Sequence, residues 1–307
     1  MRNAFIDTVI EECLRRDDIF IISGDAGLGV FDKFTKQRPD RFLNLGVAEQ
    51  NAIGCAAGMA LAGFRVYVYN IIPFVLYRCY EQVRNDICYQ KLPVTLVGIG
   101  SGFSYAPMGM THYSVEDIGL AQTLPNLRVF SPADPAEAES VARVTLAESG
   151  PTYVRLAKRG EPRIHHGAAP EVTLPLQLTE GRDVALVFHG TVVNEVLEAR
   201  RMLGDMSISA MVISLPLINP CPVDKLNEML AGVSQVVTIE EHFVDSGLGS
   251  KLAFWSATHR PSWRLSCMGV KSEYVHAIRK QDGMRQHYGL TAEYIALHVS
   301  ELLWQRV

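Results

Sequence analysis

The chain has 307 residues, of which 48% are hydrophobic and 20% charged, so it can bury one large core or, as we expect, the cores of two domains. Its formal net charge of −4 comes without any Lys/Arg-rich block, which argues against a nucleic acid partner. No apolar stretch approaches the roughly 20 residues of a membrane span, and Asp7 and Glu11 interrupt any signal peptide, so we expect a cytoplasmic protein without a membrane partner.

Helix-like and strand-like patterns alternate along the first half of the chain. Helices are predicted over 1–16, 50–62, 75–90 and 135–148, and strands over 19–22, 41–45, 65–72, 94–99, 127–131 and 152–156. Such alternation is typical of an α/β fold with a largely parallel sheet. A long glycine-rich loop is expected from Gly100 to Thr111.

A stretch rich in glycine and proline begins at Gly160, and we expect a linker over 166–182 between a first domain of residues 1–165 and a second of residues 183–307. The second domain is again α/β. Strands are predicted over 184–188, 209–214 and 236–240, and helices over 195–203, 223–231, 249–258 and 290–306. Its scattered histidines are expected at the surface or as caps: His189, His242, His259, His276, His287 and His298.

The six cysteines lie far apart, without a C-x-x-C pair or a Cys/His cluster of metal-ligand spacing. We therefore expect reduced, mostly buried thiols and no metal site on this chain. The cysteines are Cys13, Cys55, Cys79, Cys88, Cys221 and Cys267.

Glu49 stands between a predicted strand and a predicted helix, in the run Asn44-Leu45-Gly46-Val47-Ala48-Glu49-Gln50-Asn51. An acid at this junction has two interpretations. It stabilises the first turn of a helix, where the macrodipole and the unpaired N–H groups favour negative charge, or it is a functional acid. This run alone leaves both open.

Several segments, in order and spacing, resemble the C-terminal half of a transketolase over both domains. They are Phe31-Asp32-Lys33-Phe34, Arg38–Phe42, GVAEQNAIGCAAGMALAGFR from Gly46, Tyr80–Asp86, Thr111-His112, Val115-Glu116-Asp117, Ser131–Asp134, Arg155, Lys158-Arg159-Gly160, Glu240-Glu241-His242 and Gly247–Ser250. The resemblance implies that the first domain binds the pyrimidine of thiamine diphosphate and that the second is the transketolase C-terminal domain. Each would be a largely parallel sheet flanked by helices.

The resemblance also implies a partner chain. Enzymes of this family hold the diphosphate and its Mg²⁺ in a separate domain with a Gly-Asp-Gly segment and a later asparagine, and this sequence has no such segment. A partner N-terminal subunit would therefore supply the diphosphate and metal site. We expect an α2β2 heterotetramer in which this chain also associates with itself.

The family pattern assigns the cofactor contacts. Glu49 occupies the place of the carboxyl group that activates the cofactor by sharing a proton with its pyrimidine ring. Phe74 is the best candidate for stacking on that ring, with Tyr77 and Tyr69 as weaker alternatives, although a core phenylalanine would look the same. Asp25 matches an acid at the pyrimidine edge, or it stabilises its turn.

The family pattern also assigns the substrate contacts. His112 would hydrogen-bond a sugar or move protons, and Arg159 would bind the distal end of the sugar, often a phosphate. The sequence departs from ordinary transketolases in the loop before His112. Met108 stands in place of an acid that contacts sugar hydroxyls, and Gly100 in place of a histidine near the phosphate, so the usual pentose phosphates are in doubt.

The function that this resemblance implies is transfer of a two-carbon ketol unit from a ketose, possibly a non-standard sugar, to an aldehyde. Three alternatives are a decarboxylating ligase like 1-deoxyxylulose-5-phosphate synthase, the β subunit of a 2-oxo-acid dehydrogenase, and a scaffold subunit without catalysis. Thr111-His112 and Val115-Glu116-Asp117 look more like transketolase than like the dehydrogenase, and retention of Glu49 argues against the scaffold.

Overall fold

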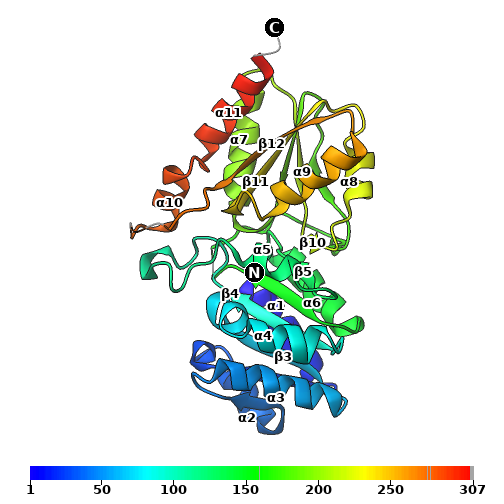
Figure 1. Ribbon diagram of the computed structural model, residues 1–307, viewed down its shortest axis with the longest axis vertical. Coiled ribbons are helices and arrows are strands. Elements are labelled where there is room, and N and C mark those ends of the chain that lie inside the picture. The colour runs from blue at the N-terminus through cyan, green and yellow to red at the C-terminus, as the bar shows by residue number, and fades with distance from the viewer. Residues whose placement is uncertain (159, 275, 277, 305–307) are drawn as a thin grey trace.

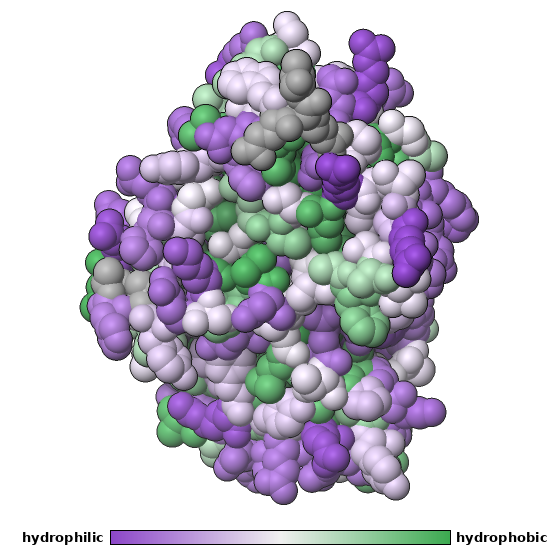
Figure 2. Space-filling view, turned by 45° about the horizontal axis from the view of Figure 1, so that its top comes forward, coloured by the Kyte–Doolittle hydropathy of each residue, from purple (hydrophilic) through white to green (hydrophobic). Residues whose placement is uncertain are grey.

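The computed structural model describes residues 1–158, 160–274, 276 and 278–304 and consists of two α/β domains stacked along its long axis (Figure 1). The predicted fold class, two domains with mostly parallel sheets flanked by helices, is confirmed. Within the described residues, no helix has the length and apolar character needed to cross a membrane. The face seen in Figure 2 is mostly hydrophilic and carries a group of hydrophobic residues near its middle.

The first sheet has the strand order β10-β5-β6-β4-β3-β1-β2, and every neighbouring pair except β10 and β5 is parallel. Its strands are β1 (Ile19–Ser23), β2 (Phe42–Asn44), β3 (Arg65–Ile71), β4 (Val94–Ile99), β5 (Arg128–Phe130), β6 (Thr152–Leu156) and β10 (Leu217–Asn219). The strands predicted for the first domain are confirmed, with ends within one residue. β4 and β6 are buried along their whole length, as parallel strands between two helical layers must be.

Helices cover both faces of this sheet. α1 (Arg2–Cys13), α2 (Asp32–Gln37) and α6 (Pro135–Ala147) pack on one face, and α3 (Glu49–Leu61) and α5 (Asp117–Gln122) pack on the other. The buried side of α3 consists mainly of alanines, which lets the helix lie close to β3. This close packing fixes the start of α3, and with it Glu49.

The helix predicted over 75–90 is present but is not a regular α-helix. π-helical turns at Pro73–Tyr77 and Val83–Cys88 flank the single α-helical turn α4 (Tyr80–Gln82). π-helical turns are rare and are often found at functional sites. Here the first one buries Val75 and Leu76 in the core and leaves Phe74 half-buried.

The second sheet has the order β12-β11-β8-β9-β7. Its strands are β7 (Leu176–Thr179), β8 (Val184–Phe188), β9 (Ala210–Ser214), β11 (Gln235–Phe243) and β12 (Arg264–Val270), and its helices are α7 (Val193–Asp205), α8 (Val223–Met229), α9 (Leu248–His259), α10 (Gln281–His287) and α11 (Ala292–Trp304). β7 lies inside the predicted linker 166–182 and pairs antiparallel with β9. Part of that segment is therefore an edge strand of the second sheet.

The second domain also contributes a strand to the first sheet. β10 follows β9 in the chain and pairs antiparallel with β5, with Leu217 opposite Phe130. The side-chain amide of Asn219 donates to the carbonyl of Leu127 at 2.8 Å. The two domains therefore share one sheet.

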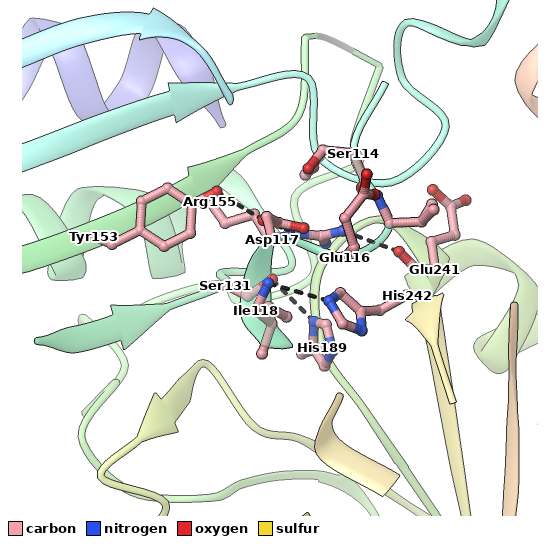
Figure 3. Close-up of polar contacts among 12 residues, drawn as sticks. Ser114, Glu116, Asp117, Ile118, Ser131, Tyr153, Arg155, His189, Glu241 and His242 are labelled. Carbon is pink, nitrogen blue, oxygen red and sulfur yellow. Dashed lines mark hydrogen bonds and ion pairs between the residues drawn. The ribbon is translucent and has the colours of Figure 1, made fainter. Parts of the chain in front are cut away.

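A buried ion pair lies at the interface between the domains (Figure 3). Arg155 on β6 donates from Nε to Asp117 Oδ2 at 2.7 Å, and the Tyr153 hydroxyl donates to the same oxygen at 2.7 Å. Arg155 Nη2 also donates to two carbonyl groups, that of Ser114 at 3.0 Å and that of Glu241 on β11 at 2.9 Å. The side chains of Arg155 and Asp117 are 1% and 0% exposed. One guanidinium thus joins both domains.

The histidines of the second domain are expected at the surface or as caps, and the surface alternative is wrong for His189 and His242, which are both buried. His189 Nδ1 lies 2.9 Å from Ser131 Oγ, and its Nε2 lies 3.2 Å from Glu240 Oε2. His242 Nε2 accepts the N–H of Ile118 at 3.1 Å and so caps the first turn of α5 from the other domain. Both histidines are therefore part of the domain interface.

We expect Asp117→Asn to lower the free energy of unfolding by about 3–5 kcal/mol, because it leaves the buried guanidinium of Arg155 without its counter-charge. Urea unfolding followed by circular dichroism measures the change. Asp205→Asn is the matched control, since it removes an acid from an exposed pair with Arg201, and exposed pairs contribute little. Equal unfolding midpoints for the two variants would contradict this interpretation.

We also expect the stability to fall on acidification through His242. Burial lowers the pKa of His242 and outweighs the opposite pull of Asp117 and Glu240. An unfolded histidine titrates near about 6.5, so below that pH the unfolded chain binds the extra proton and the free energy of unfolding decreases until the lower folded pKa is reached.

His242→Gln should reduce this loss of stability on acidification, because an amide oxygen accepts the Ile118 N–H without titrating. Thermal unfolding midpoints from about pH 5 to about pH 8 measure the effect. The exposed His259 provides the control variant His259→Gln, whose unfolding midpoint should depend on pH as that of the wild type does. If the unfolding midpoint of His242→Gln depended on pH as strongly as that of the wild type, His242 would not be the source of the loss of stability.

Candidate active site

Glu49 opens α3, directly after the turn that follows β2. Leu45 N–H donates to Ser23 O at 3.0 Å, and Asn44 Oδ1 accepts the N–H of Gly46 at 2.8 Å, so the turn is held against the end of β1. The side chain of Glu49 is only 7% exposed. The macrodipole favours an acid in the first turn of a helix, and this acid also lies at the end of the parallel strands, where α/β proteins bind ligands.

A small pocket lies beside this carboxylate. Its lining is mostly apolar or small: Ser23, Gly24, Leu45, Gly46, Ala48, Glu49, Ala52, Ile53, Val68, Tyr69, Asn70 and Val75. Among the described residues that line it, Glu49 is the only carboxylic acid. Apolar walls around one acid leave a single acidic edge for a ligand to meet.

Arg78 connects Glu49 to Phe74. Its Nη1 donates to Glu49 Oε2 at 2.8 Å, and its guanidinium lies 4.6 Å from the centre of the Phe74 ring. The side chain of Arg78 is 49% exposed, so it forms the solvent side of the pair. Arg78 is not among the residues predicted from the sequence, although its position four residues after Phe74 indicates that the two share one helix face.

His112 is a second neighbour of Phe74. The two rings meet edge to face with their centres 5.4 Å apart, and Thr111 Oγ1 lies 2.8 Å from His112 Nδ1. Three residues predicted from separate motifs, Glu49, Phe74 and His112, are therefore brought together, with Arg78 between the first two.

Tyr77 has a different environment from Phe74. Its hydroxyl forms a short hydrogen bond with Ser114 Oγ, and burial, together with the charges of Asp117 and Glu116, raises its pKa well above the ordinary value. Ser114 also bonds to Arg155 through its carbonyl group. Tyr77 thus joins the helix that carries Phe74 to the polar network of the domain interface.

The other predicted site residues are less connected. Asp25 is exposed, and its N–H donates to Gly46 O at 3.3 Å, which places its turn beside the pocket. Tyr69 lines the pocket. Met108 is 54% exposed in the loop before His112. Arg159 lies outside the described residues, and the roles of all four remain predictions.

One group of side chains has the composition of a metal site, namely Asp134, Glu137 and His165, whose ligand atoms lie within 4.8 Å of one another. Their oxygens already have donors. Asp134 accepts the N–H groups of Glu137, Ile164 and His165, and Glu137 accepts that of Ala133. His165 Nε2 lies 3.0 Å from Glu137 Oε1. The group therefore caps α6 and ties the chain after β6 to it.

Comparisons with known proteins cover both domains. Residues 1–162 match the family model described as "Transketolase, pyrimidine binding domain", and residues 176–295 match "Transketolase, C-terminal domain". A solved structure described as a split gene transketolase, inactive beta4 tetramer, superposes with a TM-score of 0.87 at 31% identity, over 98% of this chain and 97% of that chain.

Two relatives are themselves subunits of transketolases. One, from Actinobacillus succinogenes, belongs to an apulose-4-phosphate transketolase and is 33% identical over 91% of this chain and 90% of its own length. The other, from a Clostridium species, belongs to a 6-deoxy-6-sulfo-D-fructose transketolase and is 30% identical over 98% of this chain and 94% of its own length.

The 1-deoxy-D-xylulose-5-phosphate synthase of Symbiobacterium thermophilum is also similar, at 35% identity, but this chain spans only 43% of its length. The family models confirm the resemblance over both domains, and the two transketolase subunits confirm it over nearly the whole chain. The chain belongs to the transketolase family, and it matches C-terminal subunits of split transketolases over nearly their whole length.

Proposed function

We propose that this chain, as the C-terminal subunit of a split transketolase, binds the pyrimidine half of thiamine diphosphate in the pocket beside Glu49. The observation that carries the proposal is the 7% exposed carboxylate of Glu49, set among apolar walls at the end of the parallel strands and bound by Arg78, whose guanidinium also lies over the Phe74 ring. The assembled enzyme would transfer a two-carbon ketol unit from a ketose to an aldehyde.

The residues present fit the cofactor. A pyrimidine ring needs a hydrogen-bonding acid at its edge and an apolar surface on its face. Glu49 offers the acid, and the half-buried Phe74 offers a ring that contacts the guanidinium of Arg78 and the ring of His112. When bound, the cofactor supplies a nucleophilic carbon for attack on the ketose carbonyl.

Each predicted residue has a role in this proposal. Glu49 shares a proton with the pyrimidine edge, and Phe74 stacks on its face, while Tyr77 fixes the helix that carries Phe74. His112 hydrogen-bonds the sugar and holds or moves a proton at its hydroxyl groups. Asp25 holds the opposite edge of the pyrimidine.

The partner chain would hold the diphosphate and Mg²⁺, since the sequence has no Gly-Asp-Gly segment. An α2β2 heterotetramer is the proposed assembly. A cytoplasmic location agrees with the six free cysteines, because thiols of this kind persist in reducing compartments.

Non-standard sugars are the proposed substrates. The relatives named above are transketolase subunits for apulose 4-phosphate and 6-deoxy-6-sulfo-D-fructose, and this chain has Met108 and Gly100 where ordinary transketolases have polar groups. Arg159 would contact the distal end of such a sugar.

We expect Glu49→Gln to reduce turnover of the reconstituted two-subunit enzyme by about 10²–10⁴-fold, because an amide cannot share the proton that activates the cofactor. Steady-state ketol transfer measures the loss, and circular dichroism checks that the fold is intact. Glu11→Gln, at an exposed acid of α1, is the control and should retain wild-type turnover. Full activity in Glu49→Gln would refute the proposed role.

Donor specificity distinguishes the remaining alternatives. A transketolase should consume ketoses and leave pyruvate, whereas a decarboxylating synthase or a 2-oxo-acid dehydrogenase should release CO₂ from a 2-oxo acid. Calorimetric titration of thiamine diphosphate into the reconstituted pair tests the scaffold alternative, because a scaffold would give no binding heat. Consumption of pyruvate without ketol transfer would overturn the proposed reaction.

A further inference from the structure

A chain of contacting side chains leads from Glu49 to Tyr105, in the loop before His112. It starts with Arg78 at 4.6 Å from the Phe74 ring, continues with Phe74 at 5.4 Å from the His112 ring, and reaches Tyr105, whose ring centre lies 6.5 Å from that of His112. The three rings, Phe74, His112 and Tyr105, thus form a row with a cation at each end. At the far end this is Lys158, whose Nζ lies 4.7 Å from the centre of the Tyr105 ring.

Tyr105 explains why position 100 is glycine. Gly100 has φ +100°, and a Cβ added there would lie 2.2 Å from Cδ2 of Tyr105. No other residue fits without moving the ring. The tyrosine ring thus fills the space next to position 100, where the resemblance to transketolases implies a histidine near the sugar phosphate.

The second domain holds this loop in place. Glu241, which is 1% exposed, accepts the N–H of Phe103 at 2.9 Å, and Gly102 leaves room for its carboxylate because a Cβ there would lie 2.1 Å from Oε2. The ring of Phe103 stacks on Tyr288 with the centres 5.7 Å apart. In Figure 1 the loop lies directly beneath α10. Tyr105 therefore projects from an anchored segment.

Lys158 is available to a ligand. It is half-buried, and within the described residues it has no carboxylate partner. Arg2 also faces Tyr105: burial raises the pKa of the tyrosine, and the positive charge of Arg2 lowers it in part. A cation on an aromatic face has N–H groups left to donate, and charge-assisted bonds to oxyanions are stronger than neutral ones.

We propose that Tyr105 and Lys158 form the distal end of the substrate channel, where the Lys158 ammonium binds the terminal oxyanion of the sugar, a phosphate or a sulfonate, and the Tyr105 ring holds that ammonium in place. The inference rests on the proposed function, because it takes the row from Glu49 to Tyr105 as the channel. In this proposal the Tyr105 ring fills the space that a histidine at position 100 would occupy, and Lys158 supplies the positive charge.

The test uses the reconstituted two-subunit enzyme loaded with thiamine diphosphate and Mg²⁺, with glycolaldehyde as a neutral acceptor. Three donors share one carbon chain: fructose 6-phosphate, 6-deoxy-6-sulfo-D-fructose and fructose. Lys158→Met should reduce the preference in kcat/KM for a charged donor over fructose by roughly tenfold or more, mainly through KM. The donor whose preference falls identifies the oxyanion as phosphate or sulfonate.

Two further variants separate the ring from the charge. Tyr105→Leu should lower the same preference because the ammonium loses its platform, whereas Tyr105→Phe keeps the aromatic face and should retain the preference. Lys225→Met removes an equal charge from the exposed surface of α8 and should leave the preference at the wild-type value. An unchanged preference in Lys158→Met, or equal losses in Tyr105→Leu and Tyr105→Phe, would overturn the proposal.

A binding measurement tests the Lys158 subsite separately from the proposed function. Inorganic phosphate and methanesulfonate are titrated calorimetrically into the same loaded complex, without turnover. Weaker binding of either anion to the Lys158→Met complex than to wild type supports the subsite. Equal affinities overturn it, whereas an enzyme that transfers no ketol unit from any ketose refutes the proposed function instead.

Discussion

The buried pair of Arg155 and Asp117 is the interaction on which the rest of the structure depends. A guanidinium and a carboxylate that are both taken out of water need a matching charge and hydrogen bonds, and here Tyr153 and two carbonyl groups supply further bonds to the pair. Both bonds to the carboxylate go to Asp117 Oδ2, and Oδ1 is buried without a partner among the described residues. One of the two carbonyl groups belongs to Glu241 of the second domain. The buried guanidinium of Arg155 therefore keeps all of these bonds only while the two domains are aligned as they are here.

The candidate active site is attached to this network at two points. Tyr77 reaches Ser114 from the helix of Phe74, and the side chain of Glu241 holds the loop that carries Tyr105. The segments proposed to contact the cofactor and the substrate are thus both attached to the same interface. Neither Phe74 nor His112 contacts the second domain through the bonds described, so the interface acts on them only through these two attachments.

Much of the fold follows from the sequence because burial produces simple patterns. Parallel strands between two helical layers are largely apolar, and this pattern predicts β1, β3, β4, β5 and β6 within one residue of their ends. The short edge strand β2 is also predicted, although it is only half-buried to exposed. β7 and β10 are missed because they are short edge strands whose partners are distant in sequence. The π-helical turns are missed because the pattern of apolar residues does not distinguish them from an α-helix.

The site is predicted less completely. Glu49, Phe74 and His112 come from family motifs, and the structure brings them together, while their roles remain predictions. The burial of His189 and His242 is not evident from the sequence, because their partners Ser131 and Ile118 belong to the other domain. The place of Tyr105 over Gly100 likewise depends on loop geometry.

The strand β10 has a consequence for the chain as a whole. Separating the domains after residue 165 would leave β5 as an open sheet edge with unpaired N–H and C=O groups, which is a template for aggregation. The shared sheet therefore ties the edge of the first domain to the second. A transketolase that is divided into two genes can be cut between the partner chain and this one, but a cut between these two domains would break a sheet.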